Sequence, residues 1–303
     1  MRKVILATLA ALSVVAVACA PESSSTSTSA AGSATPATAA ECAQQHAGDL
    51  LTDGTLTIGT GNPAYPPWWE GGTTKANPDW EFNDPYLGQG FEGAVAFAVA
   101  DKLGFSKDQV TFVPVKFNQS FAPGDKPFDF VLQQISYTAD RDKSVDFSDS
   151  YYDVNQAVVS VEGSSIANAT SLAELKDATL GAPSGTTSYD YIVNEIQPTQ
   201  DPKVYDDLNG AANALKNGQV DGLVVDLPTA FFMTAVQIPK GVIVGQFPST
   251  GQQEYFGMVF QDGNPLRDCV NQALAELKSD GTLQQIQQEW LSDKASAPVL
   301  SAG

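Results

Sequence analysis

Strands and helices alternate along this chain, and the alternation starts again near its middle. In the first half, short apolar runs typical of strands surround a stretch of helical spacing at residues 93–103; the runs are at 55–60, 110–115 and 128–132. After Asp149 the same alternation repeats, from residues 156–161 to 242–245. Successive strands separated by helices pair in parallel. The sequence therefore predicts an α/β fold in two parts, each a mostly parallel sheet flanked by helices.

The chain opens with a segment typical of protein export. Arg2 and Lys3 precede an apolar stretch, residues 4–18, that is too short to span a bilayer comfortably. We therefore interpret residues 1–18 as a signal peptide.

Two forms of cleavage are consistent with the residues around Cys19. In one, Cys19 becomes the lipid-modified first residue of a lipoprotein; in the other, the small residues Ala16 and Ala18 direct ordinary signal cleavage. Residues 19–41 are rich in Ser, Thr, Ala and Pro, so they cannot bury a core and are interpreted as a low-complexity tether. A tether suits a lipid anchor, which favours a lipoprotein at the outer face of the cell membrane.

Composition excludes several classes of function. The formal net charge is -19, from 35 acidic and 16 basic residues, and such a surface would repel the phosphates of nucleic acids. The chain has one histidine, His46, and no two cysteines at the spacing of a zinc motif. We therefore expect no metal, no cofactor and no histidine-activated nucleophile.

The cysteine count indicates a disulfide. If lipid takes Cys19, only Cys42 and Cys269 remain. Two thiols in an oxidising compartment form a bond, so we predict a disulfide between them. The alternative is a pair of buried free thiols.

Residues 135–141 contain the side chains best suited to bind a small ligand. Ser136 and Arg141 stand just after an apolar run typical of a buried strand, and the chain has only three arginines. Because a guanidinium meets a carboxylate through two parallel hydrogen bonds, we predict that Arg141 binds a small acid. The alternatives are a surface Arg141 paired with Asp140 or Asp146, and a Ser136 that only caps a strand end.

Further motifs, taken in order, make the chain resemble a known family. They are GT at 59–60, YPPW at 65–68, GFE at 90–92, the 128–148 region, APSGTT at 182–187, DGLVVD at 221–226, and YFGM, GNPL, NQAL and DGT between 255 and 282. Over roughly residues 52–292 the chain resembles the extracytoplasmic solute-binding protein family 3, the substrate-binding proteins of polar amino-acid ABC transporters.

The resemblance implies a two-lobed, periplasmic-binding-protein-like fold of type II with two hinge strands. Lobe 1 would comprise residues 42–151 and 253–293, lobe 2 residues 152–252, and the C-terminal tail residues 294–303. It also implies a protein without catalysis. Such a protein binds a free L-amino acid in the cleft between the lobes and, as a monomer, delivers it to an ABC permease in the membrane.

The resemblance also assigns residues to the ligand. Arg141 and the backbone N–H groups of Ser136 and Thr187 would bind the α-carboxylate. Asp226, the Ser136 hydroxyl and the backbone carbonyl of Gln134 would bind the ammonium group. The alternative for Thr187 and Asp226 is ordinary capping of the helix that follows, and for Asp226 the two roles are compatible.

Tyr65, Trp68 and Phe117 are the candidates for aromatic walls around the ligand's side chain, with packing in the core as the alternative for each. Binders of basic amino acids in this family commonly carry an acid just after the first strand, where this chain has Gly61 and Asn62. We therefore expect an uncharged polar amino acid, and which one stays open.

An enzyme on the same fold is the main alternative. Some relatives in this family resemble cyclohexadienyl (arogenate or prephenate) dehydratases, whose chemistry needs a carboxylic acid as proton donor, and Asp226 could be recruited for it. A sensor role for the same cleft is a third option.

Overall fold

A computed structural model describes residues 38–248, 253–291 and 297–302. The predicted signal peptide, Cys19 and most of the predicted tether lie outside these ranges. Among the described helices, none combines the length and the low polarity needed to cross a membrane.

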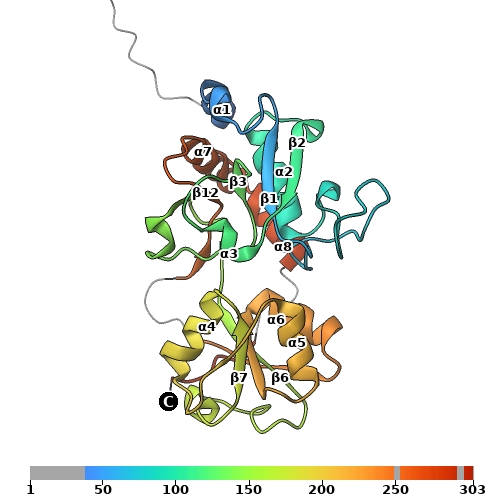
Figure 1. The fold of residues 1–303 in the computed structure, drawn as a ribbon, viewed down its shortest axis with the longest axis vertical. Helices are drawn as coiled ribbons and strands as arrows, with labels where there is room; N and C mark the ends of the chain where they lie inside the picture. The colour runs from blue at the N-terminus through green and yellow to red at the C-terminus, as the bar shows by residue number, and fades with distance from the viewer. Residues whose placement is uncertain (1–37, 249–252, 292–296, 303) are drawn as a thin grey trace, which may run out of the picture. The chain divides into compact units, whose positions relative to one another are not determined.

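The first of two five-stranded sheets takes four strands from the first half of the chain and one from its end (Figure 1). Its order is β2 (Val110–Pro114), β1 (Leu56–Thr60), β3 (Phe130–Val131), β12 (Val259–Gln261) and β4 (Val145–Phe147). Strand β1 pairs in parallel with β2 and β3, whereas β12 runs antiparallel to both β3 and β4. Four strands therefore point one way and β12 points the other.

The second sheet follows the same plan. Its order is β10 (Gly241–Gln246), β6 (Gln156–Val161), β9 (Gly222–Asp226), β7 (Leu180–Pro183) and β8 (Lys203–Tyr205). Strand β7 is parallel to β8 and β9, and β6 is antiparallel to β9 and β10. The predicted pair of mostly parallel sheets is confirmed.

Helices flank both sheets, and short 3-10 and π turns join them. The α-helices are α1 (Ala39–Gln45), α2 (Phe91–Lys102), α3 (Phe117–Ser120), α4 (Thr187–Tyr191), α5 (Leu208–Lys216), α6 (Leu227–Phe232), α7 (Leu266–Ser279) and α8 (Thr282–Leu291). The 3-10 turns are Ala47–Asp49, Pro85–Leu87, Lys107–Gln109, Arg141–Lys143 and Leu172–Leu175, and the π turns are Ile192–Ile196 and Met233–Gln237.

The first core forms because its elements bury apolar faces against one another. All five residues of β1 are buried, and α7 buries one side at helical spacing, with Cys269, Val270, Ala273 and Leu277 among its buried residues. Helices α2, α7 and α8 pack together and share a core cluster with β1. Separate buried clusters surround the second sheet.

A two-stranded ribbon lies where the hinge was predicted. Strand β5 (Tyr152–Asp153) pairs antiparallel with β11 (Tyr255–Phe256). The predicted boundary between residues 151 and 152 falls directly before β5. The other predicted boundary, between residues 252 and 253, adjoins residues 249–252, which lie outside the described ranges. The exact lobe boundaries stay a prediction.

The end of the chain lies against the second sheet. In the predicted tail, Val299 bridges to Gln246 and Ser301 to Ser171, and Leu300 is buried among residues of that sheet's core. The described part of the tail is therefore a packed segment.

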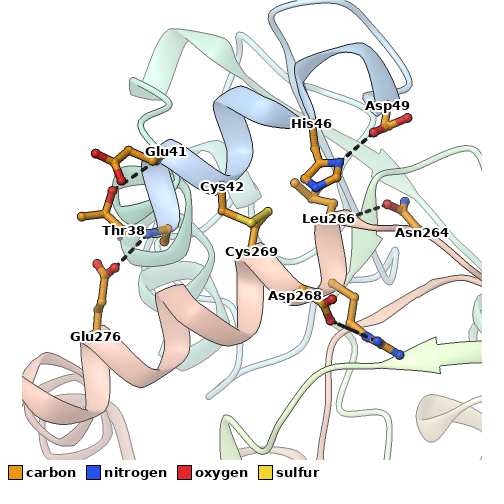
Figure 2. Close-up of a disulfide and its surroundings, with 12 residues drawn as sticks. Thr38, Glu41, Cys42, His46, Asp49, Asn264, Leu266, Asp268, Cys269 and Glu276 are labelled. Atoms are coloured by element: carbon orange, nitrogen blue, oxygen red, sulfur yellow. Dashed lines mark hydrogen bonds and ion pairs between the residues drawn. A yellow bond between two sulfur atoms is a disulfide. The ribbon is translucent and has the colours of Figure 1, made fainter. Parts of the chain in front are cut away.

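Cys42 of α1 and Cys269 of α7 form the predicted disulfide (Figure 2). Nearby, the backbone N–H of Ala39 donates to the Glu276 carboxylate at 2.9 Å, and the Thr38 hydroxyl caps α1 by accepting from the N–H of Glu41. The bond closes a loop with a sequence separation of 227 residues. It ties the start of the folded chain to the helix that follows β12.

Replacing both cysteines with serine should lower the free energy of unfolding by about 3–5 kcal/mol, because the unfolded chain regains the entropy of a long open loop. Urea denaturation of the double variant and of the parent protein, each with and without reductant, measures the difference. Reductant should destabilise the parent and leave the double variant unchanged. Equal stability of the two proteins would contradict this role for the bond.

Candidate functional site

A cavity of about 580 Å³ lies at the loops that follow the strands of both sheets. Ligand sites in α/β folds lie at these carboxyl ends of parallel strands. All the residues that the sequence assigned to the ligand line this cavity: Arg141, Ser136, Asp226, Thr187, Gln134, Tyr65, Trp68 and Phe117. The structure thus brings the complete predicted set together.

Arg141 begins the 3-10 turn before β4 and holds its guanidinium against the cavity wall. One terminal nitrogen donates to the backbone carbonyl of Ser136, and the other donates to that of Gly185 at 2.8 Å. The guanidinium carbon lies 4.3 Å from the ring centre of Phe121, a neighbour that the sequence had not singled out, and 5.6 Å from that of Phe117. Burial lowers the pKa of Arg141 to about 10, so the group stays charged at neutral pH.

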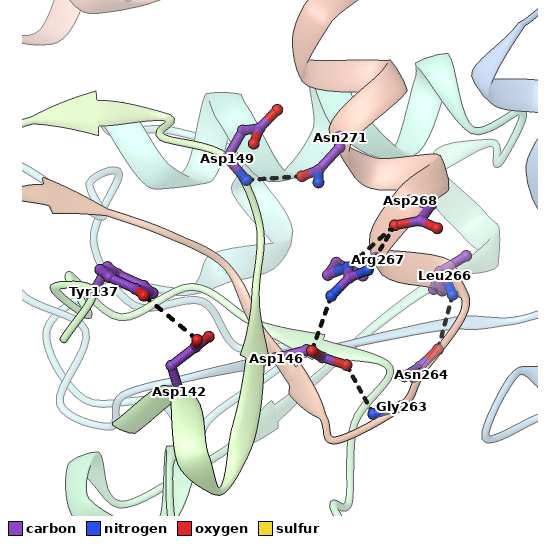
Figure 3. A network of polar contacts seen from close by, with 10 residues as sticks. All are labelled: Tyr137, Asp142, Asp146, Asp149, Gly263, Asn264, Leu266, Arg267, Asp268 and Asn271. Carbon is purple, nitrogen blue, oxygen red and sulfur yellow. Dashed lines mark hydrogen bonds and ion pairs between the residues drawn. The ribbon is translucent and has the colours of Figure 1, made fainter. Parts of the chain in front are cut away.

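The alternative of a surface ion pair does not describe Arg141. Asp140 pairs with Lys143 at 2.6 Å, and Asp146 pairs with Arg267 at 2.9 Å (Figure 3). Within the described ranges, Arg141 forms no ion pair. The positive charge of Arg141 is therefore available to a ligand in the cavity.

Ser136 and Thr187 meet at Glu254, a residue that the sequence reasoning missed. Both hydroxyls donate to the same Glu254 oxygen, each at 2.6 Å. Ser136 follows β3, whereas Thr187 begins α4, so the carboxylate connects segments from both halves of the chain. Glu254 directly precedes the YFGM motif, and that position was its only signal in the sequence.

Thr187 itself is not a capping residue. The N-cap position of α4 belongs to Thr186, whose hydroxyl donates to the carbonyl of Pro183. The capping alternative for Thr187 is therefore wrong. As the first residue of a helix, Thr187 has a backbone N–H with no partner inside the helix.

Asp226 ends β9 and lines the same cavity as Arg141. It occupies the N-cap position of α6, yet its side chain makes no capping bond and accepts instead from Gln156 Nε2 at 2.6 Å. Burial, followed by the nearby charge of Glu254, raises the pKa of Asp226 to about 8. The carboxyl thus lies in surroundings that favour a cationic partner.

Gln134 is held by a buried acid. Its backbone is left-handed, with φ 49°, and its N–H donates to Glu92 Oε1 at 2.8 Å. Trp69 Nε1, Tyr151 Oη and the Gln134 side chain also donate to this carboxylate. Burial raises the pKa of Glu92 to about 7, and the four donors oppose that rise. Glu92 thus connects the cavity wall to Tyr151, which directly precedes β5.

The three aromatic candidates differ in their surroundings. Trp68 is 1% exposed and packs edge-on against Phe91 and Phe256, so the core alternative holds for it although it also lines the cavity. Its indole N–H donates to Thr229 of α6 at 3.2 Å. Phe117 and Tyr65 are half-buried on the cavity wall.

Metal chemistry finds little support in the described part of the chain. One group of metal-type ligands there, Cys42, His46 and Cys269, lies within 4.8 Å of one another, but the two sulfurs are joined as a disulfide. Arginine, hydroxyl, amide and carboxyl groups line the cavity instead, and these recognise an organic ion.

Comparisons with known proteins agree with this geometry. Residues 71–293 match the model of the bacterial extracellular solute-binding proteins, family 3. ABC transporter arginine-binding protein 1 of Escherichia coli (strain K12) is 31% identical over 54% of this chain and 67% of its own. L-cystine-binding protein TcyJ of the same strain is 27% identical over 78% and 82%. The structure of an ancestral amino acid-binding protein, a precursor of cyclohexadienyl dehydratase, has a TM-score of 0.61 and 26% identity, covering 79% of this chain and 96% of that one.

Replacing Asp226 with asparagine should stabilise the ligand-free protein at pH 8. A native pKa above the unfolded value of 3.8 means that the native state binds the proton more tightly, so the wild type loses stability as pH rises from about 4 to about 8. The Asn variant lacks this loss and keeps an acceptor for Gln156. Urea denaturation should show a gain of about 1–2 kcal/mol at pH 8 that vanishes near pH 4. A variant that is less stable than the wild type at pH 8 would contradict this account.

Proposed function

Because the chain belongs to family 3 of the bacterial extracellular solute-binding proteins, we propose that it is the substrate-binding component of an ABC transporter for a free L-amino acid. One observation carries the proposal: a half-buried arginine and a half-buried aspartate line the same cavity. An amino acid presents a carboxylate and an ammonium group on one carbon atom. The two charged groups of the cavity complement these two charges.

In the proposed complex, Arg141 directs its remaining N–H groups at the α-carboxylate, which also accepts from the backbone N–H groups of Ser136 and Thr187. The ammonium group lies against Asp226, the Ser136 hydroxyl and the carbonyl of Gln134. Since Arg141 already bonds Gly185 of the second half, the ligand joins groups that both halves supply. Closure around the ligand then shifts an existing equilibrium between open and closed forms.

We also propose how the lobes of the protein are organised and where the protein acts. Residues 42–151 and 253–293 form one lobe and residues 152–252 the other. Lipid at Cys19 holds the protein at the outer face of the membrane. The part of residues 19–41 that precedes α1 gives it reach to a permease. The protein acts as a monomer and without catalysis.

A dehydratase is the second candidate, and one observation favours it. The raised pKa of Asp226 keeps this carboxyl partly protonated near neutral pH, as a proton donor requires. Incubation with arogenate or prephenate tests this candidate. Product formation that Asp226→Asn abolishes would establish catalysis, whereas stable binding without turnover supports transport.

Screening the purified protein against the twenty amino acids by thermal unfolding tests the proposed function. A true ligand at about a hundred times its dissociation constant adds about 2.7 kcal/mol to the free energy of unfolding, because it binds only the native state. We expect a clear rise in melting temperature for a few polar amino acids. No shift with any amino acid would refute the proposal.

Arg141→Lys should weaken binding of the best amino acid at least tenfold, since lysine keeps the charge and loses the planar pair of donors. Isothermal titration calorimetry measures the loss. Arg267→Lys is the matched control, because Arg267 pairs with Asp146 and Asp268 and does not line the cavity (Figure 3). Equal affinities for the two variants would remove Arg141 from the site.

A further inference from the structure

The charges that line the cavity do not balance. Its acids are Asp206, Asp207 and Asp226, and its bases are Lys116 and Arg141. The α-carboxylate and ammonium of the proposed ligand use Arg141 and Asp226, which offset one another. Glu254 adds another carboxylate where it accepts from Ser136 and Thr187. A ligand without charge on its side chain would leave this surplus of negative charge unmatched.

A buried hydroxyl on the cavity wall has no partner. Thr60 is 0% exposed and ends β1, and within the described ranges its Oγ1 forms no hydrogen bond. Buried polar atoms without partners are rare in native proteins, so Thr60 Oγ1 indicates a group that binds there. Tyr65 follows in the next loop, and in the described part of the chain the backbone N–H of Asn209 is the one group near its buried Oη that bonds it. Both residues line the cavity.

The acids of the second half lie beside this wall. Burial and then the charges of Asp207 and Glu81 raise the pKa of Tyr65, which places Tyr65 within electrostatic reach of Asp207. Asp207 is the N-cap of α5, where its Oδ1 accepts from the N–H of Gly210 at 2.7 Å. The other carboxylate oxygen is not needed for the cap. Asp206, adjacent in the chain, contributes a second exposed carboxylate at the cavity.

No acid directly follows the first strand, where Gly61 and Asn62 stand. A Cβ built at Gly61 would lie 2.6 Å from the end of the Gln133 side chain, which accepts from the Ser120 hydroxyl. The acids that line the cavity, Asp206 and Asp207 among them, come from the second half.

We infer that Thr60, Tyr65, Asp206 and Asp207 form a subsite for a positively charged side chain, so that the ligand is a cationic amino acid. This inference rests on the proposed function and deepens it. An ammonium or guanidinium group donates hydrogen bonds to the carboxylates and to the two hydroxyl oxygens. The aromatic face of Tyr65 offers a further contact that favours a cation. This assignment replaces the uncharged ligand expected from Gly61 and Asn62.

Calorimetric titration with L-arginine, L-lysine, L-glutamine and L-glutamate tests the subsite. The wild type should bind arginine or lysine at least about tenfold more tightly than glutamine, and glutamate most weakly. The double variant Asp206→Asn/Asp207→Asn should lose this preference and keep its affinity for glutamine. Asparagine caps a helix as well as aspartate does, so α5 is preserved. Asp201→Asn, an exposed acid of the same half that does not line the cavity, controls for net charge.

Each outcome has a distinct meaning. If the wild type binds glutamine as tightly as arginine and lysine, the subsite is overturned and the proposed function stays intact. The same follows if the double variant loses affinity for glutamine and for arginine equally. If none of the four amino acids binds, and the screen of twenty confirms this, the subsite and the proposed function are both overturned. Loss of preference in Asp201→Asn as well would assign the effect to net charge and so overturn the subsite.

Discussion

The half-buried guanidinium of Arg141 is the interaction on which the candidate site depends. Taking a cation out of water is costly, and here two backbone carbonyls and the ring of Phe121 offset only part of that cost. A carboxylate that binds Arg141 would offset the rest of this desolvation cost. Because one carbonyl belongs to Ser136 and the other to Gly185, the same side chain also holds the loop after β3 against the loop after β7. In the proposed complex, ligand affinity and the contact between these two loops therefore depend on one charge.

The acids of the site lie close together and share hydrogen-bond donors. Gln156 Nε2 donates to Asp226 and lies 3.4 Å from both oxygens of Glu254, so one neutral amide serves two carboxyl groups. Burial and then the charge of Glu254 raise the pKa of Asp226, and a bound cation would oppose that rise. Glu92 is a third acid, buried behind Gln134, where four donors keep it in place. It connects the cavity to Tyr151 at the ribbon formed by β5 and β11, so a change at the hinge reaches the wall of the cavity through hydrogen bonds.

Local patterns predicted the alternating strands and helices and the residues at their ends. Arg141 and Ser136 were singled out because they follow an apolar run typical of a strand, whereas Thr187 and Asp226 were assigned from the family resemblance. All four lie near a strand end or a helix start, and parallel strands bring their carboxyl ends to one edge. Cys42 and Cys269 were paired by count alone. Glu254, Asp206 and Asp207 were missed, because their places at the cavity depend on how distant segments meet. For the same reason, the absence of an acid at Gly61 and Asn62 carried no information about the acids that the second half brings to the cavity.

The packed C-terminal segment has a consequence for motion. Helix α8 packs with α2 beside the first sheet, whereas Val299 and Ser301 bridge to Gln246 and Ser171 of the second half. The described end of the chain thus packs on the second half, although the helix before it packs in the core of the first sheet. Leu300 is 1% exposed among apolar residues of the second sheet's core, so detaching this end would expose an apolar side chain to water. The last described residues therefore stay with the second half in any change of the cavity's width.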